Sequence, residues 1–365
     1  MTYKHRSIVD TIPSYKQGKP APVLDGVRAY KISSNENPYE PLESVKEAIA
    51  TRALNVINRY PNMRGNEVVE ELAKRFEVTP DEVVLGCGST EVITQLVDLV
   101  AGPGDEVVYP WRSFEAYPII VTAAGATSVQ IPNRADGSHD VDGIINAVNE
   151  HTRLVILNNP NNPTSASLSE ADARKVLDAV PNDVLVLIDE AYVQFNTAEG
   201  TADGMKLYRE YPNVVVAQTF SKAYGLAGLR IGYAVAPAEV VEGMRKVAVP
   251  FGVSQVAQVA ALASLEDAAS EEMKIRVAAL IAERERVLGA LREQGWNITD
   301  AYANFFWMPF GAETERATER FVAAGLSVRA FAGDGIRITI GETEANNRVL
   351  NICEELKKDG FSLNN

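Results

Sequence analysis

Lys222 lies in a segment whose residue types suit the binding of a phosphorylated aldehyde. The apolar run of residues 213–217 predicts a short buried strand and the glycines after Lys222 predict a loop, so this lysine is expected just beyond a strand end. A lysine amine can form a Schiff base with an aldehyde. The hydroxyls of Thr219 and Ser221 and the guanidinium of Arg230 suit a phosphate dianion. Pyridoxal phosphate carries both groups, although a lysine at any single position is more often a solvated surface residue.

Two polar segments follow other predicted strands. Asp189 comes directly after the apolar run 184–188, and ligands of an α/β sheet bind beyond the carboxyl ends of its strands. A carboxylate there can pair with a protonated pyridine nitrogen, and Tyr192 and Asn162 are candidates to contact the phenolic oxygen of the same ring. Each segment also has a plain structural reading, since Asp189 could be a helix cap and the Asn-Pro run 158–165 a rigid turn.

A glycine turn and an aromatic residue complete the candidate contacts. Gly88 and Ser89 lie between a predicted strand and the helix predicted over residues 90–100, where free N–H groups and the helix dipole favour a phosphate. The turn matches neither the dinucleotide-binding nor the Walker pattern, and alone it is weak support for a ligand. Phe114 could stack on a pyridine ring, although an aromatic residue more often packs in a core or an interface.

The composition narrows the classes of protein. The chain has 365 residues, 46% of them hydrophobic, and a net charge of −14, which disfavours nucleic acid as a partner. Cys87 and Cys353 are the only cysteines and lack metal-ligand spacing, so we expect no zinc site, no disulfide framework and a reducing cytoplasmic location. No signal peptide and no apolar run long enough to cross a membrane are visible.

Helical and strand patterns alternate through the middle of the chain. This alternation predicts an α/β fold with a mostly parallel sheet and helices on both faces. We expect an N-terminal arm over residues 1–40, a large cofactor-binding domain over 41–250 and a small α+β domain over 251–365. The expected elements include strands at 83–85, 154–157, 184–188, 305–308 and 337–340, and helices at 90–100, 170–180, 271–293 and 346–357.

The order of these motifs along the chain is more specific than any one of them. Glycine turn, aromatic residue, Asn-Pro segment, Asp-x-x-Tyr, Ser-Lys and arginine follow one another as in the fold-type I pyridoxal-phosphate-dependent aminotransferases. The chain resembles the histidinol-phosphate aminotransferase group and, within it, the actinobacterial aromatic amino acid aminotransferases. The resemblance covers nearly the whole chain and includes the motifs Asn35-Glu36-Asn37-Pro38, Asn58-Arg59-Tyr60-Pro61 and Arg337-Ile338-Thr339-Ile340-Gly341.

The resemblance implies a role for each cofactor contact. Lys222 would hold the aldehyde of pyridoxal 5'-phosphate and move the proton, and Asp189 would pair with the ring nitrogen. Tyr192 and Asn162 would hold the phenolic oxygen, and Phe114 would stack on the ring. The phosphate would be bound by Gly88, Ser89, Thr219, Ser221 and Arg230.

The resemblance also implies a homodimer and a substrate site for amino and keto acids. Tyr60 would reach the cofactor phosphate of the partner subunit, so the two active sites would be shared. Arg337 would bind the substrate carboxylate, with Tyr15, Asn35 and Arg329 at the mouth of the site. Two positions depart from the family pattern, because Ser165 and Glu40 stand where glycines are usual. We expect the backbone at Ser165 to avoid an angle that only glycine adopts.

Substrate choice is expected to depend on the segment Pro250-Phe251-Gly252-Val253. Enzymes for histidinol phosphate commonly carry Pro-Tyr-Asn-Val here, and Phe251 and Gly252 offer a more apolar site. We therefore expect transamination of phenylalanine, tyrosine and tryptophan with 2-oxoglutarate, with histidinol phosphate as the alternative. Arg329 and Arg337 suit a phosphate or a carboxylate and do not decide between them.

Two further classes share this fold. A decarboxylase or carbon–sulfur lyase would have the same cofactor contacts but would need no keto acid. A cofactor-sensing transcription regulator would need a DNA-binding domain, for which the segment before Asn35 is too short.

Overall fold

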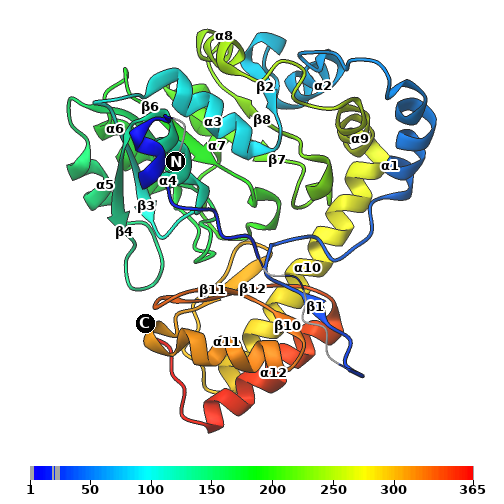
Figure 1. Cartoon of the computed structure of the whole chain (residues 1–365), viewed down its shortest axis with the longest axis vertical. Helices are drawn as coiled ribbons and strands as arrows, with labels where there is room; N and C mark the ends of the chain where they lie inside the picture. Colours follow the sequence, from blue (N-terminus) through cyan, green and yellow to red (C-terminus); the bar gives the residue numbers. More distant parts are fainter. Residues whose placement is uncertain (1–3, 19, 21–24, 365) are drawn as a thin grey trace.

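β-branched and apolar runs form a seven-stranded sheet in the larger part of the molecule (Figure 1). Its order is β2-β8-β7-β6-β5-β3-β4; β8 runs antiparallel to both of its neighbours and all other pairs are parallel. The predicted mostly parallel sheet is thus confirmed. The strands are β2 (Val83–Gly86), β3 (Glu106–Trp111), β4 (Thr127–Pro132), β5 (Thr152–Asn158), β6 (Leu185–Asp189), β7 (Val214–Thr219) and β8 (Gly232–Val235).

Helices cover both faces of this sheet, so consecutive positions in the middle of its central strands are apolar. In β5, Val155 and Leu157 belong to one buried cluster and Leu154 and Ile156 to the cluster on the opposite face. One face is covered chiefly by α3, α4 and α8, and the other by α1, α2, α6 and α9. The helices are α1 (Glu43–Ala48), α2 (Asn66–Phe76), α3 (Ser89–Val100), α4 (Ala116–Ala124), α5 (Val141–Ala147), α6 (Glu170–Ala179), α7 (Gly204–Glu210), α8 (Ala238–Val247) and α9 (Gln255–Leu265).

The smaller part is built on a three-stranded antiparallel sheet of order β11-β12-β9. A short parallel pair, β1 with β10, adds the N-terminal segment to this part. The long helix α10 begins beside α9 of the larger part and runs into the smaller part (Figure 1). The elements are β1 (Tyr30–Lys31), β9 (Phe305–Met308), β10 (Leu326–Ser327), β11 (Arg329–Phe331), β12 (Gly335–Thr339), α10 (Asp267–Glu293), α11 (Thr314–Ala323) and α12 (Thr343–Lys358).

The division between the two parts falls inside α10 when it is judged by packing. The buried cluster of the large sheet continues through α9 to Ala269, and from Met273 onward the buried apolar residues of α10 belong to the cluster of the smaller part. The expected boundary at residue 250 stays a prediction, and the core of the larger part extends about one helix beyond it. Tyr30 and Ile32 are buried in the smaller part, so the end of the expected arm is core rather than surface.

The structure is a computed structural model that describes residues 4–18, 20 and 25–364. Residues 1–3, 19 and 21–24 of the expected arm, and residue 365, lie outside the described ranges. The strands and helices expected from the sequence are present within a few residues of their predicted ends. The Ser169 hydroxyl accepts a hydrogen bond from Asp172 N and so caps the start of α6. Within the described ranges, no helix combines the length and the apolar character needed to span a membrane.

Candidate active site

The carboxyl ends of three adjacent parallel strands bring the candidate side chains together. Asn158 of β5 lies beside Asp189 of β6, and β7 ends next to them at Thr219. These ends and the N-terminus of α3 surround a cavity of about 190 Å³. Its lining includes ten of the residues predicted from the sequence: Tyr15, Ser89, Phe114, Asn162, Asp189, Tyr192, Thr219, Ser221, Lys222 and Arg230.

Lys222 lies between this cavity and a second one on the side of the smaller part. Its Nζ donates to the Ser34 carbonyl oxygen at 3.3 Å and lies 5.6 Å from the centre of the Tyr192 ring. Burial, with the positive charges of Arg337 and Arg230, lowers the pKa of this amine to about 7. A large fraction of Lys222 is therefore the free, nucleophilic amine at neutral pH.

Asp189 is buried at the bottom of the cavity. One carboxylate oxygen accepts from the Tyr117 hydroxyl at 2.5 Å and the other from Ala191 N at 3.2 Å. Burial raises the pKa of Asp189 to about 6, against the opposing effects of the Tyr117 hydrogen bond and the Lys222 charge. The sequence prediction missed Tyr117, whose only signal was its place one helical turn after Phe114; the two rings meet edge to face at 5.5 Å.

Tyr192 and Asn162 link the first cavity to the substrate side. The Tyr192 hydroxyl accepts from Asn35 Nδ2 at 3.0 Å, and burial raises its pKa to about 12. The Asn162 side-chain oxygen accepts from Arg337. With its oxygen engaged in this way, Asn162 keeps its amide N–H groups as the part of the side chain that can donate to a ligand.

A phosphate-sized cup lies at the N-terminus of α3. Gly88 caps that helix with a φ of 76°, and a Cβ at this position would lie 2.4 Å from Arg230 Nη2, so the backbone and the guanidinium approach closely only because residue 88 is glycine. Arg230 Nη1 donates to the Ser221 hydroxyl at 3.3 Å, and Ser221 N donates to the Thr219 hydroxyl at 3.1 Å. Hydroxyls, a guanidinium and a helix N-terminus form a donor set typical of phosphate sites.

The second cavity, of about 100 Å³, shares Tyr15, Phe114, Asn162, Tyr192 and Lys222 with the first. It also contains Asn35, Arg329 and Arg337, the remaining residues predicted for the substrate mouth. Arg337 is buried; it donates to Asn162 and to the Ser33 carbonyl oxygen, and its Nε has no partner among the described residues. A buried donor without an acceptor is costly, so a carboxylate ligand at Arg337 is favoured.

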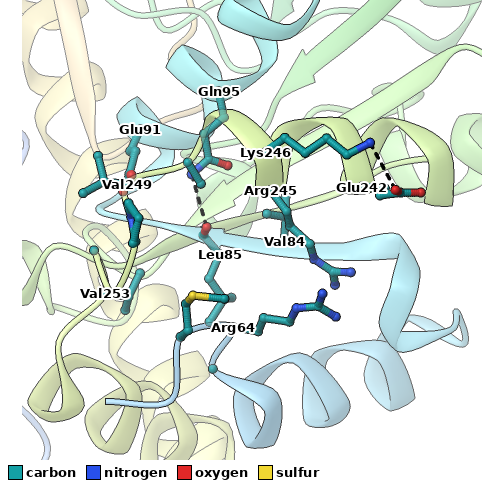
Figure 2. Close-up of a pocket in the computed structure, with 15 residues that line it drawn as sticks. Arg64, Val84, Leu85, Glu91, Gln95, Glu242, Arg245, Lys246, Val249 and Val253 are labelled. Carbon is teal, nitrogen blue, oxygen red and sulfur yellow. Dashed lines mark hydrogen bonds and ion pairs between the residues drawn. The ribbon is translucent and has the colours of Figure 1, made fainter. Parts of the chain in front are cut away.

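Tyr60 and Phe251 lie apart from both cavities of this chain. Their rings stack on each other with centroids 4.8 Å apart, and they are 84% and 41% exposed. The expected apolar slot is therefore not brought to the chain's own substrate cavity. Gly252 instead lines a separate cavity of about 290 Å³ beyond the phosphate cup, with Arg64, Leu85 and Val253 (Figure 2).

Ser165 differs from what the sequence predicts. Its φ is +63°, in the left-handed region that the serine was expected to avoid. The compensation comes from its hydroxyl, which accepts from Ala303 N at 2.8 Å and from Tyr302 N at 3.0 Å. A glycine could not make these contacts between the larger and the smaller part.

Together, the doubly covered sheet, the lysine at its carboxyl edge and the phosphate cup define a fold-type I enzyme that binds a phosphorylated aldehyde. A family model described as aminotransferase class I and II matches residues 29–352, and the chain belongs to this family. Members of the family depend on pyridoxal 5'-phosphate, and the donor set around Lys222, Asp189 and Arg230 fits that cofactor.

Several relatives are similar over nearly their whole length. Proteins named aromatic amino acid aminotransferase from Streptomyces avermitilis and Cutibacterium acnes are 49% and 45% identical to the chain; the alignments cover 98% of this chain in both cases, and 98% and 100% of the relatives. The solved histidinol-phosphate aminotransferase from Sinorhizobium meliloti in complex with pyridoxal-5'-phosphate superposes with a TM-score of 0.83, at 26% identity, over 91% of this chain and 92% of that one.

Proposed function

We propose that this chain catalyses the transamination of aromatic L-amino acids with 2-oxoglutarate, giving aromatic 2-oxo acids and glutamate. The observation that carries the proposal is the junction of two cavities at Lys222, one with a phosphate cup and one with Arg337, which has a donor left for a carboxylate. Phe114, Tyr15 and Phe331 supply aromatic surface on the substrate side. The names and the 45–49% identities of the relatives described above support the aromatic substrate class.

Each residue of the site has a defined task in this chemistry. When bound, pyridoxal phosphate withdraws the electron pair released as the substrate loses its α-proton. Lys222 would hold the aldehyde carbon of the cofactor. Its amine, when free, would take the proton from the substrate Cα as a general base and later return a proton as a general acid. The negative charge of Asp189 would keep a proton on the pyridine nitrogen. Arg337 fixes the carboxylate, so that the Cα–H bond points toward Lys222.

Histidinol phosphate is the second candidate donor, because Arg329 and Arg337 place two guanidinium groups in the substrate cavity. A coupled assay with 2-oxoglutarate as acceptor would compare phenylalanine with histidinol phosphate. We expect a higher kcat/KM for phenylalanine and no turnover without a keto acid. A preference for histidinol phosphate would overturn the aromatic assignment, and turnover without a keto acid would indicate a decarboxylase or lyase.

We also propose a cytoplasmic homodimer with shared active sites. Several other large apolar side chains are exposed on the same two segments as Tyr60 and Phe251, namely Leu54, Ile57, Met63 and Val249, and the last two line the 290 Å³ cavity. Exposed apolar side chains gathered in this way are typical of an interface between chains. The stacking of Phe251 on Tyr60 implies that, if Tyr60 reaches the partner's phosphate cup, Phe251 enters the partner's site with it.

A further inference from the structure

The substrate cavity contains an acidic side chain, Glu115, which pairs with Arg329. Arg329 donates to the Glu115 carboxylate through Nη2 and through Nε, the latter at 3.2 Å. The Glu115 side chain is 25% exposed and the Arg329 side chain 11%, so the pair is shielded from water on most sides. Both residues line the cavity that also contains Lys222 and Arg337. An ion pair in such a place is stronger than one on the open surface.

The two arginines of the cavity are therefore unequal. Arg329 and Arg337 lie directly opposite each other on the antiparallel strands β11 and β12, and both guanidinium groups lie over Phe331, at 5.3 and 6.0 Å from its ring centre. Arg329 already has a carboxylate partner. Arg337 has only neutral partners and an Nε without an acceptor among the described residues. Of the two arginines of the cavity, only Arg337 therefore lacks a carboxylate partner.

We propose that Glu115 is a specificity-determining residue that occupies Arg329 and so disfavours amino donors that carry a phosphate monoester. This inference rests on the proposed aromatic aminotransferase function and names the group that makes the choice. A substrate with a single carboxylate needs only Arg337. A phosphate dianion beside Arg337 would approach both arginines and would be repelled by the Glu115 carboxylate.

The acceptor 2-oxoglutarate has a second carboxylate in addition to the one that Arg337 would bind. This second carboxylate carries one negative charge, whereas a phosphate monoester carries up to two. The repulsion from Glu115 is correspondingly smaller for this substrate. The same residue can therefore disfavour a phosphate ester strongly and still tolerate the keto acid that the reaction needs.

The test is Glu115→Gln in the cofactor-loaded enzyme, because glutamine keeps the size and a hydrogen bond to Arg329 but removes the charge. The expected result is a rise of at least ~10-fold in kcat/KM for histidinol phosphate, with that for phenylalanine changed by less than ~3-fold. Calorimetry adds a readout independent of turnover. The affinity for 2-phenylethyl phosphate should rise by a similar factor, whereas that for 3-phenylpropionate, which has one carboxylate, should stay nearly constant.

Asp334→Asn is the matched control. Asp334 pairs with Arg112, which also lies over Phe331, so the variant removes one negative charge nearby without freeing Arg329. Asp334→Asn should leave unchanged both the ratio of kcat/KM for histidinol phosphate to that for phenylalanine and the ratio of the affinities for 2-phenylethyl phosphate and 3-phenylpropionate. Equal shifts in Glu115→Gln and Asp334→Asn, or no shift in Glu115→Gln, would overturn the role of Glu115 while leaving the proposed function intact. A wild-type enzyme that prefers histidinol phosphate would overturn the proposed function and this inference together.

Discussion

At the scale of single residues, the reactivity of the site depends on one amine and one carboxylate with shifted pKa values. Lys222 is held near a pKa of 7 by burial and by neighbouring arginines, and Asp189 near 6 by burial. Both shifts disfavour the charged form. Lys222 is consequently ready to react as a neutral amine. Asp189 gains most from a positively charged ligand partner, which would restore the stability of its ionised form.

The first prediction concerns the pH dependence of cofactor uptake by the apoenzyme. Below the pKa of Lys222 the amine is protonated and cannot attack an aldehyde, and above it the amine is free. The rate of reconstitution with pyridoxal phosphate, followed by visible absorbance, should therefore rise with pH and level off with a midpoint near 7. Nα-acetyl-lysine amide, whose one amine is an ordinary ε-amine, is the control in the same buffers. A midpoint near the ordinary lysine pKa in the protein would contradict the lowered value.

The second prediction concerns Asp189→Asn. Asparagine retains the size of the side chain and an acceptor for the Tyr117 hydroxyl, but it cannot hold a proton on the pyridine nitrogen by charge. The rate of the half-reaction with phenylalanine, measured by stopped flow, should fall by at least ~100-fold. Tyr117→Phe removes the hydrogen bond to Asp189 but keeps the carboxylate itself, so it should have a smaller effect. Near-normal rates in Asp189→Asn would argue against this role.

At the scale of elements, the position of the site follows from strand ends that the sequence marks clearly. Apolar runs covered on both faces predict β5, β6 and β7, and the polar residue after each run predicts which side chains meet. Pairs from distant segments could not be predicted in this way. Tyr117 meets Asp189 from 72 residues away and Glu115 meets Arg329 from 214 residues away, because the packing of α4 and β11, not local sequence, brings them together.

The Asn-Pro turn after β5 provides the third prediction. Ser165 has a left-handed backbone conformation, which destabilises a non-glycine residue by about 1–2 kcal/mol. Its hydroxyl accepts from Ala303 N, so Ser165→Ala should lower the free energy of unfolding by about 1–3 kcal/mol. Ser165→Gly loses the same acceptor but also removes the strain of the left-handed backbone. Glycine gives back part of this gain because it increases the entropy of the unfolded chain, so Ser165→Gly should be less destabilising than Ser165→Ala by about 0.5–1 kcal/mol.

Urea denaturation of the two Ser165 variants measures this difference. Ser138→Ala serves as the control, because the Ser138 hydroxyl bonds only its near neighbour Asp136 on the surface, and we expect a change below about 0.5 kcal/mol. Equal stability of Ser165→Ala and Ser165→Gly would mean that the backbone strain at Ser165 is no larger than the entropic cost of glycine, which contradicts the prediction.

At the scale of the whole molecule, the larger and smaller parts meet at the substrate cavity. The loop after β3 is joined to the smaller part by two ion pairs, Glu115 with Arg329 of β11 and Arg112 with Asp334 in the turn after β11. A third link is the hydrogen bond between Ser165 of the Asn-Pro turn and Ala303. The site therefore depends on the relative placement of the two parts. The resemblance to known aminotransferases predicts a further dependence on a second chain, through the exposed pair Tyr60 and Phe251.

The fourth prediction tests that dependence by complementation between inactive variants. Tyr60→Ala and Lys222→Ala should each lose activity when they are alone. In a heterodimer of the two, one site has Lys222 of the first chain and Tyr60 of the second, whereas the other site has neither. Random exchange under mild denaturation makes about half of the dimers mixed, so activity should recover to about a quarter of that of the wild type.

A mixture of Tyr60→Ala with the double variant Tyr60→Ala/Lys222→Ala has no intact site and is the control. If exchange is verified by differently tagged chains and activity stays at the level of Tyr60→Ala alone, Tyr60 acts within its own chain. In that case its 84% exposure and its stacking on Phe251 would need another cause than a shared site.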